Sequence, residues 1–524
     1  MNPLEIHYIL RIIFAYLDDS DRDSIYNTCR IFRQNYLWVD PTISMMKSMD
    51  HDNKRKVDEI LGVVGEYINY SHDGLLHWSC QHNYPKIVEL CMPKQCHNLD
   101  CGFMTAAHCG NFEVALILLM DPHVDPSGSH NYAIRDASEH GHLLMIDPLL
   151  KDPRVDPSVM HNDPIRYASE NGHLFVVERL LMDPRVDPSD VRNYAIGKAS
   201  KNGHLSIVNR LLQDPRVDPS DRSNYAIRKA SKHGQLSVVE RLLQDPRVDP
   251  SDLRNEANRY ASYHGHLSVV DRLLMDPRVD PCDMNNEAFR AASGTGHLSV
   301  VERLLQDLRV DPSVTNNDAI RIASLNGHLS VVERLLIDNR VNPSDVNNDA
   351  IHQASFNGHL SMVERLLMDP RVDPSTGNNL AICIASKNGH LQVVERLLMD
   401  PRVDPSDLNN LAICMASNQG HFSIVERLLE DSRVNPSDRS NAVIRSAASH
   451  GNLQIIQRLL EDPRVSLDIN YRIHYHCLLF YNRIYTNITN TVGYITSTLG
   501  KRKKIITYII CLTQIGLTIG KDIS

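Results

Sequence analysis

Histidine recurs at a fixed interval along most of this chain, and imidazole is the side chain that most often binds metals or moves protons near neutral pH. Each of these histidines follows a glycine of a series spaced by 31 residues. The nine are His142, His173, His204, His266, His297, His328, His359, His390 and His421. Zinc ligands must lie about 2.1 Å from one ion, whereas equivalent side chains of stacked helices lie about 8 to 10 Å apart. We therefore interpret these histidines as structural residues of a turn.

Cysteine and histidine also gather between residues 91 and 109, and both types bind zinc. The six residues are Cys91, Cys96, His97, Cys101, His108 and Cys109. The cysteines do not form the compact Cys-x-x-Cys pair that is typical of zinc sites. We weigh a zinc site against buried or unreactive thiols and favour the thiols, so the sequence predicts no metal ligand and no cofactor.

Motifs of catalysis do not stand out from this sequence. It has no glycine-rich phosphate loop, no nucleophile motif and no isolated pair of acids, because carboxylates such as Asp183 and Asp187 recur in nearly every loop. We expect no enzyme. The formal net charge of -9 and the pI near 6.3 also disfavour a nucleic-acid partner.

The feature that must position all these residues is the glycine series itself. Its members are Gly110, Gly141, Gly172, Gly203, Gly234, Gly265, Gly296, Gly327, Gly358, Gly389, Gly420 and Gly451. A fixed period of this length indicates a solenoid, in which each repeat buries its apolar face against its neighbours.

Residues 193–223 illustrate one repeat. Asn193 is a favoured residue for the start of a helix, and we expect its side chain to cap the first turn. Small and apolar residues such as Ala195, Ile196 and Ala199 give this helix of about nine residues a narrow packing face. Gly203 is predicted to end it in a left-handed conformation.

A second helix and a loop complete the repeat. Leu205, Val208, Leu211 and Leu212 form the predicted apolar stripe of the second helix. The loop Asp-Pro-Arg-Val-Asp-Pro-Ser follows, and we expect Val217 to pack beneath it because the two prolines restrict the loop. The fold class is therefore all-α, a helix-turn-helix solenoid of about 12–13 repeats of 31 residues.

The pattern Ala199-Ser200-x-x-Gly203-His204-Leu205-x-x-Val208-x-x-Leu211-Leu212 resembles the core of ankyrin repeats. Two features depart from that family. The unit has 31 residues where the family has about 33, and an Asn-Tyr-Ala-Ile type of sequence replaces Thr-Pro-Leu-His. The short loop puts the ankyrin β-hairpin in doubt. The resemblance implies a non-catalytic surface for protein partners, on a concave face lined by the first helices and the loop tips.

The first 45 residues resemble an F-box, in the pattern Pro-x-Glu-Ile, then Tyr16-Leu17, then Cys29-Arg30-x-Phe32-Arg33. The resemblance implies docking on the Skp-type adaptor of a cullin-RING ubiquitin ligase. The residues carried over are Pro3, Ile6, Ile9, Leu10, Ile13, Leu17, Ile25 and Phe32. Glu5 stands farther before Leu17 than the family usually has it. The alternative is that these helices only cap the solenoid.

The domain organisation follows from these patterns. We expect an F-box-like helical segment at 1–45, degenerate repeats at 46–102, the ankyrin-like array at 103–465 and an irregular C-terminal cap or tail at 466–524. The apolar run in the tail, from Ile505 to Gly520, is shorter than the roughly 20 residues that span a membrane. We favour a cap over a membrane anchor.

Near-identical loops behind an F-box-like start resemble repeat proteins of giant DNA viruses that infect amoebae. An odd number of cysteines, eleven, without a framework spacing indicates reduced thiols. We therefore expect an intracellular protein of the host cytoplasm, with the nucleus as an alternative, and a monomer.

Two columns of the first helices vary while the rest of the repeat is constant, and we call their basic, aromatic and apolar members the variable strip. They are Lys198, Lys201, Lys229, Lys232, Tyr260, Tyr263, Ile322, Leu325, Phe356, Ile384 and Met415. An apolar strip beside a basic patch suits a protein with acidic and apolar surfaces. The sequence thus predicts a substrate-recognition adaptor of a ubiquitin ligase; the alternative is a plain ankyrin-type protein that masks or tethers a host protein. Packing against the next repeat, or neutral variation, would also account for the columns.

Overall fold

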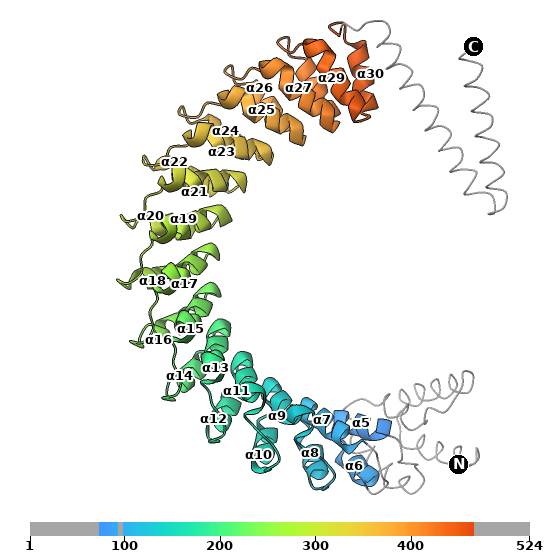
Figure 1. Ribbon diagram of the computed structural model, residues 1–524, viewed down its shortest axis with the longest axis vertical. Helices are drawn as coiled ribbons and strands as arrows, with labels where there is room; N and C mark the ends of the chain where they lie inside the picture. Colours follow the sequence, from blue (N-terminus) through green and yellow to red (C-terminus); the bar gives the residue numbers. More distant parts are fainter. Residues whose placement is uncertain (1–72, 93–97, 466–524) are drawn as a thin grey trace, which may run out of the picture. The chain divides into compact units, whose positions relative to one another are not determined.

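The computed structural model describes residues 73–92 and 98–465, and every regular element among them is a helix (Figure 1). The F-box-like segment and the tail lie outside the described residues. The helices are α5 (Asp73–His82), α6 (Pro85–Cys91), α7 (Leu99–Cys109), α8 (Phe112–Leu119), α9 (Gly128–His140), α10 (Leu143–Lys151), α11 (Val159–Asn171), α12 (Leu174–Leu181), α13 (Asp190–Asn202), α14 (Leu205–Leu211), α15 (Asp221–Lys232), α16 (Leu236–Leu242), α17 (Asp252–Tyr263), α18 (Leu267–Leu274), α19 (Asp283–Thr295), α20 (Leu298–Leu305), α21 (Val314–Leu325), α22 (Leu329–Ile337), α23 (Asp345–Phe356), α24 (Leu360–Leu367), α25 (Thr376–Asn388), α26 (Leu391–Leu398), α27 (Asp407–Gln419), α28 (Phe422–Leu429), α29 (Asp438–Ser449) and α30 (Leu453–Glu461).

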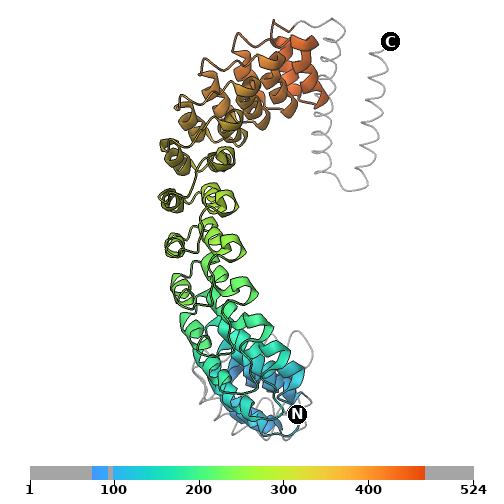
Figure 2. The same ribbon diagram turned by 60° about the vertical axis from the view of Figure 1, so that its left-hand side comes forward.

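These helices form pairs, and the pairs are distributed over two compact units that divide between Asp280 and Pro281. Within each unit, the first helix of a pair packs on the first helix of the next pair, as α13 does on α15 and α25 on α27. The second helices form a separate layer, in which α14 packs on α16 and α26 on α28 (Figure 2). The predicted all-helical solenoid with a period of 31 residues is confirmed.

The first helix of the specimen repeat begins with a left-handed turn. Val191, Arg192 and Asn193 have φ angles of 50°, 58° and 59°, a conformation that costs about 1 to 2 kcal/mol for each L-residue. The right-handed helix follows this turn and continues to Asn202. Bonds made by the turn must therefore offset its conformational cost.

Asn193 makes those bonds, and the prediction that it caps its own helix is wrong. Its side-chain oxygen accepts from the backbone N-H of Asp218 at 2.8 Å, and its amide donates to the Asp221 carboxylate at 3.1 Å. Asp218 lies in the loop that follows α14, and Asp221 begins α15, the first helix of the next pair. The N-cap position is Ser189, and no side chain caps there. The buried Asn column thus fastens each repeat to its successor.

A glycine ends the first helix, as predicted. Gly203 has φ of 80° and ψ of 19° at the end of α13, a conformation that glycine adopts without the steric cost of a Cβ. His204 then stands at the N-cap of α14 and donates from Nε2 to the carbonyl of Glu170 at 2.9 Å. The interpretation of the repeat histidines as structural residues is supported by this bond to the preceding repeat.

The second helix is short and buries one face. Ile207, Val208 and Leu211 are buried in α14, whereas Leu205 and Leu212 are only half-buried. The predicted stripe was therefore partly wrong, because it included both flanking leucines and omitted Ile207. Helices of this length are unstable alone, so stacking must stabilise them.

The loop between repeats is a network of charged side chains over one buried valine. Asp214 accepts from the backbone N-H and the guanidinium of Arg216 at 2.7 to 3.0 Å, and these bonds lower the pKa of the Asp214 carboxyl. Arg216 also donates to the carbonyl of Val186 in the preceding repeat at 2.9 Å. Val217 is 1% exposed beneath the loop, as predicted. Neither this loop nor any other described segment contains a β-strand.

The helix pair α5 and α6 precedes the regular array and has the character of an eroded repeat. Trp78 stacks on Tyr84 with ring centroids 5.1 Å apart, and Ile87 and Val88 are buried. Asn83 has φ of 59° and takes the conformation that glycine holds elsewhere. No helix in residues 73–92 and 98–465 has both the length and the hydrophobicity to cross a membrane.

Candidate protein-binding strip

The variable strip lies on the first helices of both units, and the repeat explains its position. Its first six members lie on α13, α15 and α17, and the other five on α21, α23, α25 and α27. Tyr263 and Phe356 are 51% and 49% exposed, whereas the other nine are half-buried. The expectation that all of them face outward is therefore only partly met, because adjacent first helices pack closely in this layer.

The constant residues of the repeat, here called the framework, bond to backbone carbonyls in one column of the strip, the column that holds Lys232 and Leu325. Leu325 accepts through its carbonyl from His359 Nε2 at 3.0 Å and from the Asn357 amide at 2.6 Å. Lys232 accepts in the same way from His266 Nε2 at 3.1 Å. A backbone carbonyl is present whatever the side chain is, so this column can change residue type while the framework keeps its hydrogen bonds.

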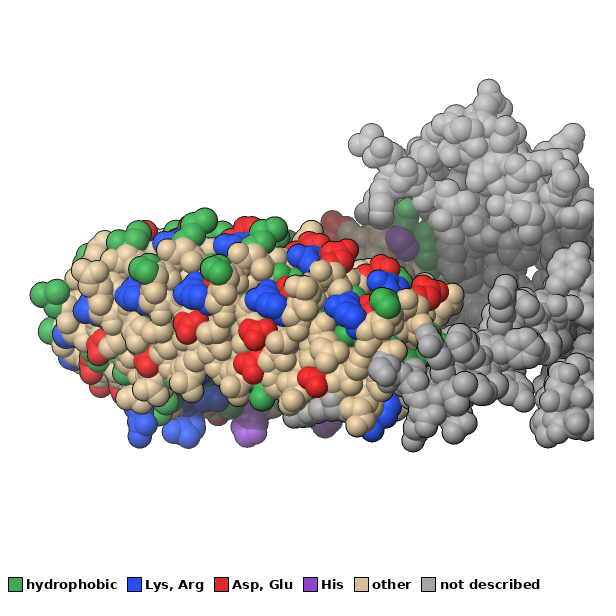
Figure 3. Space-filling model, turned by 90° about the horizontal axis from the view of Figure 1, so that it is seen from above, with side chains coloured by type: hydrophobic (Ala, Val, Ile, Leu, Met, Phe, Trp, Pro, Cys, Tyr) green, Lys and Arg blue, Asp and Glu red, His purple; other side chains and the backbone are tan. Residues whose placement is uncertain are grey.

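Identical positions of successive repeats form rows on the surface. On the face drawn in Figure 3, basic side chains recur at regular intervals in one row, with acidic and hydrophobic side chains gathered beside it. A repeated framework produces such rows, so regular spacing alone does not identify a binding surface. The informative positions are those whose residue type changes from one repeat to the next.

In the first unit the strip is basic, but its lysines are not equivalent. Lys198 donates to Glu170 at 2.6 Å. Burial alone would lower the pKa of Lys198, but the bond to Glu170 and contact with Tyr194 raise it above its ordinary value. Its charge is already neutralised within the protein.

Lys229 is in the opposite situation. Burial lowers its pKa, and repulsion from Lys232 and Arg228 lowers it further, which the attraction of Glu256 offsets only in part. Its ammonium group lies 5.2 Å from the centre of the Tyr225 ring. Among the described residues no carboxylate forms an ion pair with Lys229. This part of the strip therefore holds positive charge that an acidic ligand would neutralise.

Tyrosine rings lie beside this basic region, and two of them, Tyr194 and Tyr225, are not members of the variable strip. Tyr194 and Tyr225 stack with centroids 6.4 Å apart. Arg222 lies over both rings, at 5.4 Å and 4.6 Å from their centroids, and Arg166 lies 4.8 Å from the ring of Tyr194. The two tyrosines stand one repeat apart in the sequence, so equivalent positions place them on neighbouring helices, whereas the stacking itself is seen only in the structure.

A ladder of ion pairs borders the strip in both units. Arg228 bonds Glu256 at 2.7 Å in the first unit, and Arg321 bonds Asp349 at 2.7 Å in the second. Each pair joins one repeat to the next. Since both partners are largely buried, removing either one would leave a charge without compensation.

The strip of the second unit is apolar, and the ladder changes there too. His352 occupies the position that Arg321 holds one repeat earlier; it is 6% exposed, and burial lowers its pKa. The next equivalent residue is Cys383, whose thiol has its pKa raised to about 12, chiefly by burial. Ile322, Ile384 and Met415 lie in the neighbouring column. The variable strip and the ladder of ion pairs that borders it thus both carry less charge in this region.

The cysteine and histidine cluster of the sequence analysis is only partly brought together. Cys91 is buried, and Cys96 and His97 lie outside the described residues. Cys101 Sγ lies 3.9 Å from Nδ1 of His77, whereas His108 turns to Asp136, with 3.0 Å between Nδ1 and Oδ2. The cysteine-based zinc site therefore gains no support from these contacts.

Comparison with known proteins gives the family. The model described as "Ankyrin repeats (3 copies)" matches residues 196–288, 288–378 and 380–472, which together are more than half of the chain. Among solved structures, the human ASB11 ankyrin repeat domain matches at 18% identity, over 36% of this chain and 95% of that domain, with a TM-score of 0.30. A search of curated proteins found no match. The chain belongs to the ankyrin-repeat family, whose repeats imply a protein-binding scaffold.

Proposed function

We propose that the variable strip binds one or more protein partners. Lys201, Lys229 and Lys232 of the first unit would contact an acidic surface of a partner, and the strip members of the second unit would contact an apolar surface. The observation that carries this proposal is the bonding of the framework to backbone carbonyls of the strip. Such bonding leaves the side chains of Lys232 and Leu325 available for recognition. Exposed aromatic residues such as Tyr263 and Phe356 suit the centre of an interface.

We propose further that the chain brings this partner to a cullin-RING ubiquitin ligase. The support is the resemblance of residues 1–45 to an F-box, which would bind the Skp-type adaptor. The protein would act as a monomer in the host cytoplasm, or in the nucleus. A plain binding protein that masks or tethers its partner is the alternative, and it would leave residues 1–45 as a cap.

The strip is tested by charge reversal in the full chain. Lys229→Glu combined with Lys232→Glu should abolish capture of the partner from a host lysate, because the substituted side chains repel an acidic surface. Lys151→Glu is the matched control, since Lys151 is exposed at the end of α10, away from the strip. Equal capture by the strip variant and the control would exclude this region as the binding surface.

The proposed link to the ubiquitin ligase is tested by separate substitutions in residues 1–45. Ile9→Asp with Leu17→Asp should remove the Skp-type adaptor and the cullin from the captured proteins while the strip partner is retained. Quantitative mass spectrometry of the two sets of bound proteins reads both functions in one experiment. If neither adaptor nor cullin is captured by the unchanged chain, the plain binding protein is the correct description.

A further inference from the structure

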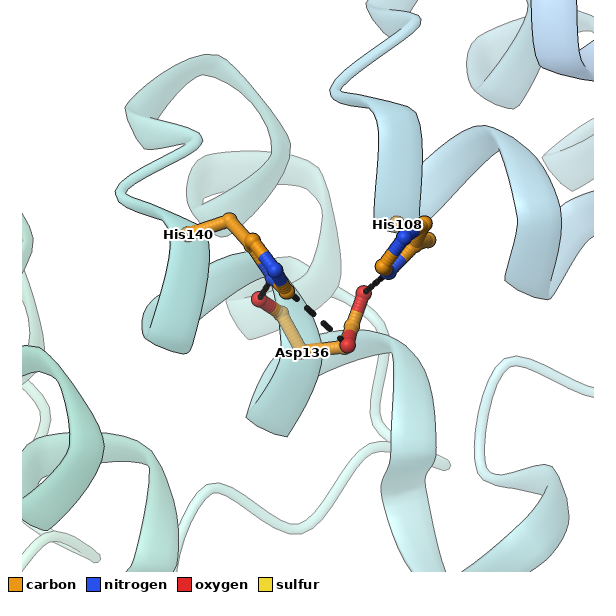
Figure 4. Close-up of side chains that lie close together, drawn as sticks. All are labelled: His108, Asp136 and His140. Atoms are coloured by element: carbon orange, nitrogen blue, oxygen red, sulfur yellow. Dashed lines mark hydrogen bonds and ion pairs between the residues drawn. The ribbon is translucent and has the colours of Figure 1, made fainter.

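Three potential metal ligands converge near the N-terminal end of the first unit. His108 is in the last turn of α7, and Asp136 and His140 are on the neighbouring helix α9 (Figure 4). His108 Nδ1 lies 3.0 Å from Asp136 Oδ2, and His140 Nδ1 lies 3.6 Å from Asp136 Oδ1. One ligand atom from each residue can be chosen so that all three lie within 4.8 Å of one another.

The carboxylate at the centre of this cluster is buried. The side chain of Asp136 is 7% exposed, whereas those of His108 and His140 are 53% and 41% exposed. A buried carboxylate needs a compensating positive charge or strong hydrogen bonds. The adjacent arginine, Arg135, points its Nε toward Asp163 at 3.5 Å. The two imidazoles and the side chain of Tyr132 are therefore the groups that face Asp136, and solvent reaches both imidazoles.

The repeat framework does not require this cluster. The equivalent position three repeats later is also a histidine, His233, whose Nδ1 bonds the carbonyl of Lys229 at 3.0 Å. His140 bonds the carbonyl of Asp136 in the same way, at 3.0 Å. The difference lies in the side chain four residues earlier, which is a lysine near His233 and a carboxylate near His140. Only the earlier repeat combines the histidine with an acid.

We propose that His108, Asp136 and His140 bind one divalent transition-metal ion of the zinc type. Imidazole and carboxylate ligands bind zinc at about 2.0 to 2.2 Å, so tetrahedral ligand atoms lie about 3.4 Å apart. His108 Nδ1 lies 3.0 Å from Oδ2 of Asp136 and His140 Nδ1 lies 3.6 Å from Oδ1, near this separation, whereas the bound on all three ligand atoms together is 4.8 Å. Small side-chain movements would therefore close the set around an ion. Three protein ligands leave a fourth position for water or for a side chain of a partner, as in open zinc sites.

The surroundings of the cluster would orient its ligands. His142 donates from Nε2 to the carbonyl of His108 at 2.9 Å, and its ring stacks on that of His140 with centroids 5.8 Å apart. Each imidazole must present an unprotonated nitrogen to the ion. His140 Nδ1 now bonds the Asp136 carbonyl, so for Nδ1 to bind the ion its proton must be carried on Nε2 instead. The ion would join α7 to α9 and hold two adjacent repeats together.

The test uses the full chain, purified without metal, and zinc chloride alone as the probe. Isothermal titration should find one more site in the unchanged chain than in Asp136→Asn or His140→Ala, since removing one ligand should weaken binding at least about 100-fold. His233→Ala is the matched control and should keep that site. Cobalt should give the visible absorption of a site without cysteine, with no sulfur-to-cobalt charge-transfer band.

Three outcomes would overturn the proposal. The first is equal zinc stoichiometry and affinity in the unchanged chain and in Asp136→Asn, which would leave a hydrogen-bonded network of the three side chains. The second is loss of binding in His233→Ala to the same extent as in His140→Ala. The third is a sulfur charge-transfer band that accounts for all bound cobalt. If Asp136→Asn fails to fold, His108→Ala decides, because His108 is half-exposed and its removal leaves the helix contacts intact.

Discussion

The two compact units are built on one framework and carry unlike strips. In the first, Lys229 and its neighbours concentrate positive charge beside tyrosine rings. In the second, Leu325 and Phe356 occupy a column that holds Lys232 earlier in the chain. The hydrogen bonds to this column are nevertheless the same, because they end on its carbonyl oxygens.

This comparison separates positions that specify the fold from positions that specify a surface. Framework residues bond to a neighbouring repeat through their side chains, so their identity matters to stability. Strip residues in the column of Lys232, Leu325 and Phe356 contribute only their backbone to those bonds, so we expect their identity to matter to recognition. Four substitutions in the second unit test this separation, and they are ordered by the expected change in the free energy of unfolding.

Gly296→Val should cause the largest loss, about 3 kcal/mol. Gly296 has φ of 82°, and an added Cβ would lie 2.5 Å from Nδ1 of His328. Gly451→Val is the control, because Gly451 has φ of 71° but, within residues 73–92 and 98–465, no neighbouring atom lies within 4 Å of the added carbon. Hydrogen exchange should show opening of the repeats around α19 to α22 in the first variant. Equal effects of both substitutions would mean that backbone conformation alone matters.

Asn317→Asp should cost about 2 kcal/mol. The Asn317 amide donates to Asp345 at 2.8 Å, and its oxygen accepts from the backbone N-H of Asn342 at 2.8 Å. The substitution would place two carboxylates at the first contact. Asn316→Ala serves as the control, since Asn316 is exposed and has a similar positive φ of 58°. Urea unfolding that gives the same loss for both would contradict the bridging role of this column.

His352→Leu should remove part of the acid sensitivity. Burial lowers the pKa of His352 below 6.5, so the unfolded chain binds a proton more readily than the folded one. The stability associated with neutral His352 is therefore present above pH 6.5 and is lost as the pH falls, by about 1 kcal/mol per pH unit. Urea midpoints between pH 7.5 and 5.5 should show a shallower slope for the variant. An unchanged slope would show that His352 is protonated without opening.

Phe356→Lys should have the smallest effect on stability, under about 1 kcal/mol. Its side chain is half-exposed, and the bonds from His390 and Asn388 end on its carbonyl at 2.9 and 2.8 Å. Capture of the partner should nevertheless be lost if the apolar strip contributes to recognition. A large decrease in the unfolding midpoint of Phe356→Lys would show that this strip residue also stabilises the fold, and would contradict the separation of framework from strip.

The sequence was sufficient for the local elements and insufficient for the contacts between repeats. The helix pair, the left-handed Gly203 and the buried Val217 follow from patterns within a single repeat. Asn193 was misassigned because capping its own helix and bonding the next loop use the same side-chain oxygen. The stack of Tyr194 on Tyr225 depends on the distance between neighbouring repeats, which the sequence pattern does not supply.

The same limit applies to the candidate sites. The zinc hypothesis drawn from the sequence grouped residues that are close along the chain, whereas His108 meets Asp136 across a separation of 28 residues. Half-burial of most strip residues likewise results from packing of one first helix on the next.

The hydrogen bonds that join neighbouring repeats span fixed separations in the sequence. The Asn column reaches 25 residues forward, the loop arginines 30 residues back and the turn histidines 34 residues back. Each bond therefore needs one adjacent copy and nothing beyond it. A duplication or deletion of 31 residues would leave every remaining bond with a partner of the right kind, wherever the cut falls within the uniform repeats. Such an array can change its length in whole repeats, and hence the extent of its binding surface, without redesign of its core.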